Sequence, residues 1–578
     1  MLHHLPGELL EAECTLGLAD DLFLHDHTLG RAIAAQDPAL LALPIVPLTV
    51  SMEILAEAAA YLRPDLRFVE MRGVRAYRWI LLEAPPVRLR ISARRVEDGP
   101  APAFHVSLTE AGPPAAEAHA RPIVEGLMVM AAQRPSPPPV APLALQDEQP
   151  SRWHGQKVYD EGMFHGPAFR AVDAVTRRGR DGAVAILRTP PLDGFLHSQP
   201  APSFVAEPVL IDAAGQLIGL WTLENLAQGF VVFPYQLARL TFYGPPFRPG
   251  EAATCQARTA LLEGSRVTSD IDLLDESGAL RVRLLGWEDK RFHISRRLYS
   301  FILRPGRNAL SDAWPAPLDG VSLRQDQDVV CRRIGDWAVW ESNFDFWATV
   351  LAHLALNPRE RAVWRGLTGP PPRRRDWLLG RIAAKEAVVA LVRRRYGLAL
   401  APADVEIATD VHGAPQVRAP WLDSLGCAVA VSIAHSGGQV AALAALGAAD
   451  SSSGVGIDVE PVSRPSEEFA TVAFTPQEAG LLAALDGGLD AGTNWPLRLW
   501  CAKEAAGKAL GRGLPGPHSL AAVSVDAAQG RVQLQPGGAL LDAAPHLAGV
   551  TLAAHTALDA GLVIAVAFHH NSHENSHA

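Results

Sequence analysis

The sequence predicts an α+β protein made of several domains in a row, on three observations. Its 578 residues are enough for three or four domains of ordinary size. Two N-terminal segments each contain one long apolar helix and several β-rich runs. From Gly335 onward, helical and strand-like segments alternate instead. We therefore expect two helix-and-sheet domains followed by an α+β domain of another kind.

Composition excludes several classes of protein. The 52 basic and 62 acidic residues give a formal net charge of −10, which argues against a protein that binds nucleic acid or an anionic membrane mainly through charge. Five widely spaced cysteines without a CxxC pair argue against a disulfide framework or a structural zinc site. No segment resembles a signal peptide or the ~18 uncharged apolar residues of a membrane span. We therefore expect a cytoplasmic protein with neither a nucleic-acid nor a membrane partner.

Proline-rich stretches mark the expected domain boundaries. Gln133–Pro150 is too rich in proline for a regular element and is long enough for a linker. A second stretch of linker-like sequence, rich in Pro, Gly and Asp, follows Leu303. The predicted organisation is a first domain at 1–132, a linker at 133–150, a second domain at 151–300, a linker at 301–334, a C-terminal domain at 335–570 with halves at about 335–450 and 451–570, and a disordered tail at 571–578.

The first two domains share one plan. Pro47–Leu62 has apolar residues at helical spacing, and Pro208–Leu223 is apolar almost all round, as a helix inside a curved sheet would be. Strand-like runs follow both helices, and those after the first are Tyr77–Leu82, Val87–Arg94 and Phe104–Leu108. One long helix wrapped by an antiparallel sheet, present twice, predicts a tandem (double) hotdog.

The C-terminal domain carries two linked acidic motifs. In the expected strand Val455–Glu460, Asp458 and Glu460 share a face because side chains alternate along a strand. In the expected helix Pro496–Leu510, Glu504 and Lys508 lie one turn apart. Three carboxylates make an oxygen site suited to Mg²⁺, which completes its shell with water and substrate phosphates. A lysine one turn further along could bind a phosphate oxygen.

A surface ion pair is the alternative interpretation of Glu504 and Lys508. The upstream acidic strand argues against it. The chain has only five lysines, at positions 157, 290, 385, 503 and 508, so two of them fall within this one motif.

These residues resemble the phosphopantetheinyl transferases of the Sfp type, whose signature is GxDxE followed by WxxKEAxxK. Further likenesses are Ser432–Ser436, the Asp410–Pro415 turn and the basic helix Arg375–Val388. The resemblance implies a two-half α/β transferase fold. It also implies a reaction in which a carrier-protein serine attacks the β-phosphate of coenzyme A and expels 3′,5′-ADP. Ala414 and Ala434 depart from the family pattern, at a lysine and a serine position respectively.

The family implies a role for each matching residue. Glu504 is the expected base, with Glu460 second, and Lys508 would stabilise the leaving phosphate. The expected Mg²⁺ ligands are Asp458, Glu460 and Glu504, and the expected coenzyme A contacts are His435, Ser436, Lys503, Arg375 and Arg381. His435 taken alone could equally be a buried structural histidine.

Three motifs in the first two domains carry acid–base residues. They are Leu24–Gly30, Tyr159–Phe169 and Asp212–Gln216. Asp212 and Gln216 share a helix face, so the amide can hold the carboxyl. Burial in so apolar a helix should raise the pKa of Asp212, which suits it to donate a proton, while a histidine can accept one.

These motifs resemble the double-hotdog dehydratases of polyketide synthases, and most closely the variants in iterative synthases of the polyunsaturated-fatty-acid, glycolipid and enediyne kind. The resemblance implies loss of water from a β-hydroxyacyl carrier protein. His27 would remove the α-proton, Asp212 would protonate the leaving hydroxyl, and Gln216 would position Asp212. His25 is the alternative base. Tyr159 and the Gly166-Pro167 turn would shape the acyl tunnel, and His165 stands where the family has a tyrosine.

Three functions remain open from the sequence. The first is a bifunctional dehydratase and phosphopantetheinyl transferase, with Mg²⁺ and coenzyme A serving the transferase half and no cofactor in the dehydratase half. The second is a transferase fused to a catalytically silent double hotdog that acts as a docking module. The third is a non-catalytic acyl- or coenzyme A-binding scaffold, against which the intact acidic motifs argue. The expected partners are apo and β-hydroxyacyl-loaded carrier proteins, other synthase domains and a second copy of the chain.

Overall fold

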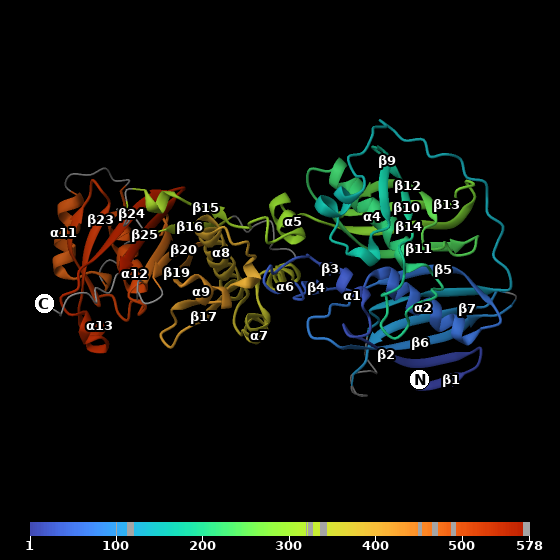
Figure 1. The fold of residues 1–578 in the computed structure, drawn as a ribbon, viewed down its shortest axis with the longest axis horizontal. Coiled ribbons are helices and arrows are strands. Elements are labelled where there is room, and N and C mark those ends of the chain that lie inside the picture. Colours follow the sequence, from blue (N-terminus) through green and yellow to red (C-terminus); the bar gives the residue numbers. More distant parts are fainter. Residues whose placement is uncertain are drawn as a thin grey trace. The chain divides into compact units, whose positions relative to one another are not determined.

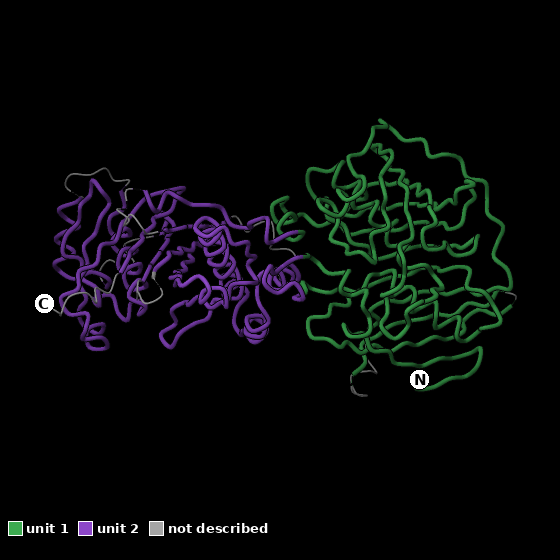
Figure 2. The backbone as a smooth tube through the Cα atoms, in the orientation of Figure 1, with its two compact units in different colours: residues 1–31, 41–303 green, residues 32–40, 304–578 purple. Residues whose placement is uncertain are grey.

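The computed structural model describes residues 1–99, 101–112, 121–319, 321, 328–335, 344–448, 454–464, 472–486 and 493–569. The chain divides into two compact units (Figure 1 and Figure 2). Unit 1 comprises residues 1–31 and 41–303, and unit 2 comprises residues 32–40 and 304–578. The predicted tail at 571–578 lies outside the described residues.

The described part of unit 1 is built on one 12-stranded antiparallel sheet made of two six-stranded halves in the order β1-β2-β6-β7-β8-β5 and β11-β14-β13-β12-β10-β9. The halves join where β5 pairs with β11, with Val74 opposite Leu237. The strands are β1 His3–Leu5, β2 Leu9–Leu16, β5 Arg67–Ala76, β6 Val87–Glu97, β7 Ala103–Glu110, β8 Val124–Ala131, β9 Val172–Gly179, β10 Gly182–Arg188, β11 Val231–Phe242, β12 Ala252–Leu262, β13 Arg266–Leu274 and β14 Leu280–Phe292.

Each half of this sheet packs around one long helix. The helices are α2 (Leu48–Leu62) and α4 (Pro208–Asn225), which confirms the predicted double hotdog. In α4, a Cβ on Gly215 would lie 3.0 Å from the Trp287 ring, so glycine lets the helix approach β14 closely. The short elements are α1 Phe23–Asp26, β3 Thr28–Leu29, β4 Leu43–Pro44, the π-helical turn η1 Val158–Gly162, the 3-10 turn η2 Pro167–Phe169 and α5 Arg296–Leu303.

One predicted strand of unit 1 is wrong. Tyr77–Leu82 is not a strand of the sheet, and β5, which ends just before it, was not predicted; nor were β1, β2, β8, β9 and β10. Ile80 and Leu82 of this segment are buried, and its backbone bonds to a neighbouring loop instead. The Val46 N–H donates to the Ile80 carbonyl at 3.0 Å, and the Leu82 N–H donates to the Pro44 carbonyl at 3.0 Å. The segment therefore supports the loop that carries Ile45.

Unit 2 contains two sheets, each with a long helix against it. The six-stranded sheet has the order β15-β16-β20-β19-β18-β17, and the five-stranded sheet has the order β21-β25-β24-β23-β22. The strands are β15 Asp312–Ala313, β16 Val329–Ile334, β17 Glu406–Thr409, β18 Pro415–Arg418, β19 Cys427–Ser436, β20 Gln439–Ala448, β21 Gly454–Pro461, β22 Leu520–Asp526, β23 Arg531–Pro536, β24 Leu552–Asp559 and β25 Leu562–His569.

The helices of unit 2 follow the predicted alternation with strands. They are α6 Phe344–Ala355, α7 Pro358–Gly366, α8 Pro371–Tyr396, α9 Pro420–Leu425, α11 Pro476–Asp486, α12 Trp495–Ala509 and α13 Gly538–Ala543, with 3-10 turns η3 Ala316–Leu318, η5 Pro402–Asp404 and η6 Pro545–Leu547. The predicted linker at 301–334 needs correction, because β16 pairs along its whole length with β20 and so belongs to the first sheet of this unit.

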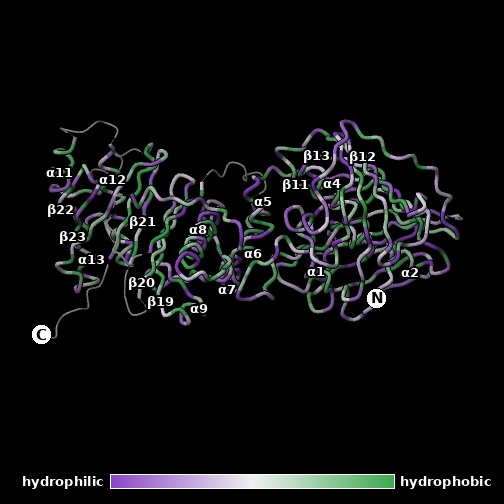
Figure 3. Tube along the Cα trace, turned by 45° about the horizontal axis from the view of Figure 1, so that its top comes forward, coloured by the Kyte–Doolittle hydropathy of each residue, from purple (hydrophilic) through white to green (hydrophobic). Residues whose placement is uncertain are grey.

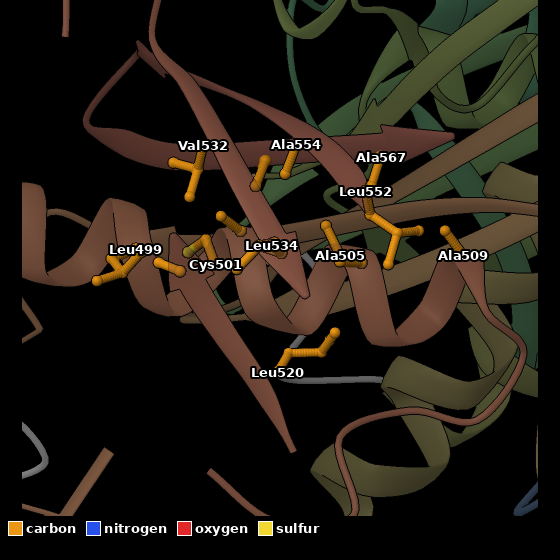
Figure 4. Close-up of a cluster of buried hydrophobic side chains, with 14 of the residues drawn as sticks. Leu499, Cys501, Ala505, Ala509, Leu520, Val532, Leu534, Leu552, Ala554 and Ala567 are labelled. Atoms are coloured by element: carbon orange, nitrogen blue, oxygen red, sulfur yellow. The ribbon is translucent and has the colours of Figure 1, made fainter. Parts of the chain in front are cut away.

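Helix α12 packs directly on the five-stranded sheet (Figure 4). Its apolar face, which includes Leu499, Cys501 and Ala505, is buried against side chains of β22 to β25. A Cβ on Gly456 would lie 1.8 Å from the Ala505 carbonyl oxygen, and one on Gly454 would lie 1.9 Å from that of Ala509. The two glycines of β21 therefore let α12 lie against the strand, and this contact sets the distance between their functional side chains.

No helix in the described part of the chain is long and apolar enough to cross a membrane. Figure 3 shows hydrophilic residues interspersed with hydrophobic ones along both units.

Candidate functional sites

Unit 1 brings together three residues that are far apart in the sequence. His27 follows α1, His165 lies between η1 and η2, and Asp212 lies in α4. One ring nitrogen of each histidine and one carboxylate oxygen of Asp212 all lie within 4.8 Å of one another. The two imidazole rings are 5.1 Å apart between centroids, and Nε2 of His165 is 3.3 Å from Oδ2 of Asp212. We call this cluster the His–Asp site.

The surroundings of His27 define its proton-accepting atom. Its Nδ1 lies 2.6 Å from the Ile45 carbonyl oxygen. A carbonyl only accepts, so Nδ1 carries the hydrogen and Nε2 keeps its lone pair. Burial lowers the pKa of His27 to about 4, with the nearby His165 adding to this effect. At neutral pH the ring is therefore uncharged and able to take up a proton.

Asp212 is held by a chain of hydrogen bonds. The Gln216 amide donates to Oδ2 of Asp212 at 2.9 Å, and the Tyr159 hydroxyl donates to the oxygen of the same amide at 3.1 Å. The expected raised pKa of Asp212 is wrong. Burial does raise it, but the interactions with His165, and after them those with His27 and Gln216, together lower it below its ordinary value. The carboxyl is therefore ionised in the resting site.

The loop that carries His165 is fixed by residues of the first hotdog. The Asp26 carboxylate accepts from the Ala168 N–H at 2.9 Å, and a Cβ on Gly166 would lie only 2.0 Å from Asp26 Oδ1. Arg31 donates to the carbonyls of His165 and Tyr159 at 2.8 and 2.7 Å. Sequence reasoning assigned no role to Asp26, which lies within the histidine motif, or to Arg31, which follows it directly.

His25 lies elsewhere. Its side chain is exposed, and its Nε2 is 2.9 Å from the Leu18 carbonyl oxygen. The geometry therefore favours His27 over His25 as the base.

Unit 2 places Asp458 and Glu460 on the face of β21 that turns toward α12, while Val455, Ile457 and Val459 enter the apolar core. Lys508 of α12 donates to Oδ1 of Asp458 at 2.8 Å and to the Ile457 carbonyl at 3.1 Å. Glu460 is held by the Ser436 hydroxyl and by Arg464. We call Asp458, Glu460 and Glu504 the carboxylate site.

Burial and neighbouring charges shift the pKa values at the carboxylate site. Burial raises the pKa of Glu504, and the negative charges of Asp458 and Glu460 raise it further. Burial likewise raises the pKa of Glu460. Burial alone would lower the pKa of Lys508, but the carboxylate of Asp458 raises it above its ordinary value. The site is thus an anionic cluster whose internal repulsion a cation would relieve.

A divalent cation fits these residues. Oδ2 of Asp458 is buried and has no hydrogen-bond partner, an unmet need that a metal ion would satisfy. Within the described residues, only the His–Asp site brings three donor atoms inside 4.8 Å of one another, so the carboxylate site is wider than that. Lys508 is paired with Asp458, and Arg464 is paired with Glu460. To bind one metal ion together, these carboxylates must exchange those partners for the ion.

The predicted coenzyme A contact by Lys503 is contradicted. Its side chain is 0% exposed, and its Nζ donates to the Ala473 carbonyl at 3.0 Å and lies 3.0 Å from Oε1 of Glu478, which is also 0% exposed. Lys503 therefore stabilises the core beneath α12. It points away from its helical neighbour Lys508.

The first half of unit 2 repeats this buried pair. Lys385 of α8 is 0% exposed and binds Glu360 and the Ala355 carbonyl. The next residue, Glu386, is the counterpart of Glu504 in the shared sequence Ala-Lys-Glu-Ala. Glu386 is buried and accepts from the Leu310 and Ser311 N–H groups, both at 2.7 Å. Among the residues that the structure describes, the first-half counterpart of Glu504 is thus occupied by backbone N–H groups and is not free to bind a cation.

The remaining predicted contacts lie on the first half. The His435 side chain is 57% exposed, and its Nδ1 is 3.9 Å from Oδ2 of Asp376. Arg375 donates to Oδ1 of the same Asp376 at 3.2 Å. Arg381 stacks on Trp377 at 3.6 Å from the ring centroid. His435 and Arg375 therefore lie together near one carboxylate, whereas Arg381 is engaged by an aromatic ring.

A basic contact that the sequence did not indicate lies at the turn between β17 and β18. Nη1 of Arg512 is 2.5 Å from Nε2 of His412, two residues before the alanine that replaces the family's lysine. Arg512 lies just beyond α12, far from His412 in the sequence, so the sequence did not indicate that these two side chains are close together.

Two family models match this chain. Residues 132–297 match the polyketide synthase dehydratase N-terminal domain, and residues 454–566 match the 4′-phosphopantetheinyl transferase superfamily. Separate segments of the chain therefore match the two families, which confirms the two resemblances seen in its motifs. The first match covers the second hotdog and leaves residues 1–131 outside it.

Three similar proteins each match part of this chain. A holo-[acyl-carrier-protein] synthase of Geobacillus kaustophilus (strain HTA426) is 41% identical over 81 residues, which are 14% of this chain and 59% of that protein. A trans-AT polyketide synthase dehydratase domain from Brevibacillus brevis is 17% identical, over 49% of this chain and 94% of that one, with a TM-score of 0.38. The dehydratase domain of PpsC from Mycobacterium tuberculosis is 19% identical over the same shares, with a TM-score of 0.36.

Proposed function

We propose that this chain is a bifunctional synthase component. Unit 1 would dehydrate β-hydroxyacyl groups on a carrier protein, and unit 2 would transfer 4′-phosphopantetheine from coenzyme A to a carrier-protein serine. The observation that carries the proposal is the pair of assembled sites: His27 faces Asp212 in unit 1, and Asp458 meets Lys508 beside Glu504 in unit 2. Both units serve the same partner, a carrier protein, which gives a reason for their fusion.

In dehydration, His27 Nε2 removes the proton from the α-carbon, the β-carbon–oxygen bond breaks, and the hydroxyl leaves as water after gaining a proton at the His–Asp site. An uncharged His27 is the form this step needs, and burial provides it. Gln216 and Tyr159 keep the Asp212 carboxylate in place. The reaction needs no cofactor.

Substitution of His27 tests the dehydratase half. His27→Ala should lower the dehydration rate by about 10²–10⁴-fold, the usual contribution of a general base. His25→Ala is the matched control and should leave the rate unchanged, since its side chain is exposed and lies elsewhere. If the wild-type chain removes no water while unit 2 modifies carrier proteins normally, the double hotdog is a silent docking module instead.

In the transfer reaction, Asp458, Glu460 and Glu504 would hold Mg²⁺. The bound ion supplies positive charge that offsets the charge developing on the diphosphate of coenzyme A. Glu504 takes the proton of the attacking serine. The new bond joins the serine oxygen to the β-phosphorus, the diphosphate bridge breaks, and 3′,5′-ADP leaves beside Lys508.

The carboxylate site is tested by Asp458→Asn. This variant should lose Mg²⁺-dependent transfer, because it removes an anionic oxygen that has no other partner. Asp542→Asn, on an exposed aspartate in the same half, is the matched control. Full transfer by Asp458→Asn would refute the site, and equal rates with Mn²⁺ and Mg²⁺ would refute only the choice of metal. Other synthase domains and a second copy of the chain complete the proposed partners.

A further inference from the structure

The proposed dehydration requires a proton for the leaving hydroxyl, and the source of that proton has not yet been assigned. The Asp212 carboxyl was expected to give a proton to the leaving hydroxyl, yet it is ionised in the resting site. Two donors, Nε2 of His165 and the Gln216 amide, approach the same oxygen, Oδ2. A carboxylate that accepts two hydrogen bonds holds no proton of its own to give.

We propose that His165 and Asp212 act as an acid pair. His165 starts the cycle as an imidazolium beside the Asp212 carboxylate, its Nε2 proton reaches the leaving hydroxyl by way of that carboxylate, and the ring is left neutral. His165 is then a positioning and proton-supplying residue, and His27 remains the base. The inference rests on the proposed dehydratase activity and adds one residue to it.

The geometry suits His165 to this role. Its side chain is 6% exposed, and its ring stacks on Phe164 with 4.2 Å between centroids. Arg31 fixes its carbonyl at 2.8 Å, and Asp26 fixes the turn that follows. The ring thus has one orientation, with Nε2 toward Asp212. Its Nδ1 is buried and makes no hydrogen bond to the described residues, so Asp212, 3.3 Å from Nε2, is the polar side chain that this ring contacts.

The pair also accounts for the return of the site to its starting state. After water leaves, His27 carries the proton taken from carbon, and the His165–Asp212 pair lacks one. The two rings are 5.1 Å apart, so the proton can return from His27 to the pair once the product has left. Over one cycle the substrate loses one hydrogen from carbon and one hydroxyl, which together make water.

Few other charged or titratable groups face the pair. Tyr159 reaches it through Gln216, and burial raises the pKa of that phenol far above neutrality. Arg31 and Arg170 bind the backbone carbonyl of His165. Asp26 is occupied by the Ala168 N–H. The pH dependence of the acid step should therefore follow the pair itself.

The test compares His165→Phe with the wild-type chain on a β-hydroxyacyl carrier protein, with a chelator present so that no metal ion occupies the two histidines. Phenylalanine keeps the stacking on Phe164 and removes the proton. We expect kcat to fall about 10²–10³-fold at neutral pH with KM changed less than threefold. We also expect the residual rate to rise as the pH is lowered, because Asp212 must then hold the proton itself.

A second variant guards against a folding defect. His165→Gln keeps a donor toward Asp212 but has no transferable ring proton, so it should show the same loss and the same acidic shift. Either variant retaining wild-type kcat, or losing rate equally at every pH, overturns the inference while leaving the dehydratase proposal intact. A wild-type chain that removes no water overturns both.

Discussion

The buried Lys503–Glu478 pair gives a sharp prediction, because its motif position suggests ligand binding and its environment indicates a structural role. Lys503→Ala removes an ammonium group that lies 3.0 Å from a carboxylate oxygen with both side chains 0% exposed. Loss of one partner leaves the other charge buried and unpaired, which costs about 3–5 kcal/mol. For a unit of this size each kcal/mol moves the midpoint by about 2–4 °C, so unit 2 should unfold ~6–20 °C lower.

Calorimetry of the full chain measures this shift, and two variants calibrate it. Lys385→Ala removes the equivalent buried ammonium in the first half and should have a similar effect. Lys508→Ala removes a side chain that is 27% exposed, so it should lower the unfolding midpoint less than Lys503→Ala does, and it should abolish transfer. An unchanged midpoint for Lys503→Ala, together with a raised KM for coenzyme A, would refute the structural assignment and restore Lys503 as a ligand-binding residue.

Three further predictions concern other parts of the molecule. Arg464→Ala should tighten Mg²⁺ binding, measured by titration calorimetry, because it frees Glu460 from a competing cation; weaker binding would contradict this. Gly166→Ala should lower dehydration and destabilise unit 1 by about 1–3 kcal/mol, because its Cβ would lie 2.0 Å from Asp26 Oδ1; a variant with unchanged activity and urea midpoint would disprove the close contact. Burial raises the pKa of Asp289 to about 8. The native carboxyl therefore binds its proton more tightly than the unfolded one, and unit 1 should lose up to a few kcal/mol as the pH rises from about 4 to 8. Asp289→Asn should flatten this fall in urea unfolding, and an unchanged slope would count against it.

The sequence predicted those features that depend on periodicity within one element. The helices α2, α4 and α12 follow from apolar spacing, and alternation along β21 placed Asp458 and Glu460 on one face. Such patterns depend only on residues within one helix or strand, so they can be recognised without knowledge of the tertiary contacts.

Features that depend on tertiary contacts were not predicted. Tyr77–Leu82 has strand-like composition, but its backbone pairs with a loop. Lys503 and Lys508 both fit the motif, and only the position of Glu478 separates the buried lysine from the functional one. Burial of Asp212 and its bond with Gln216 on the same helix were predicted, yet His165 comes from another part of the chain, and its interaction with Asp212 helps to reverse the direction of the pKa shift.

The most direct test of two active sites in one chain is the intact mass of a carrier protein. Apo carrier protein incubated with the chain, Mg²⁺ and coenzyme A should gain one phosphopantetheine arm, and with a β-hydroxyacyl coenzyme A it should gain the acylated arm and then lose one water. Asp458→Asn should stop the first gain, and His27→Ala should stop only the loss of water. An unmodified carrier protein, or an acylated arm that keeps its water with the wild-type chain, would contradict the account.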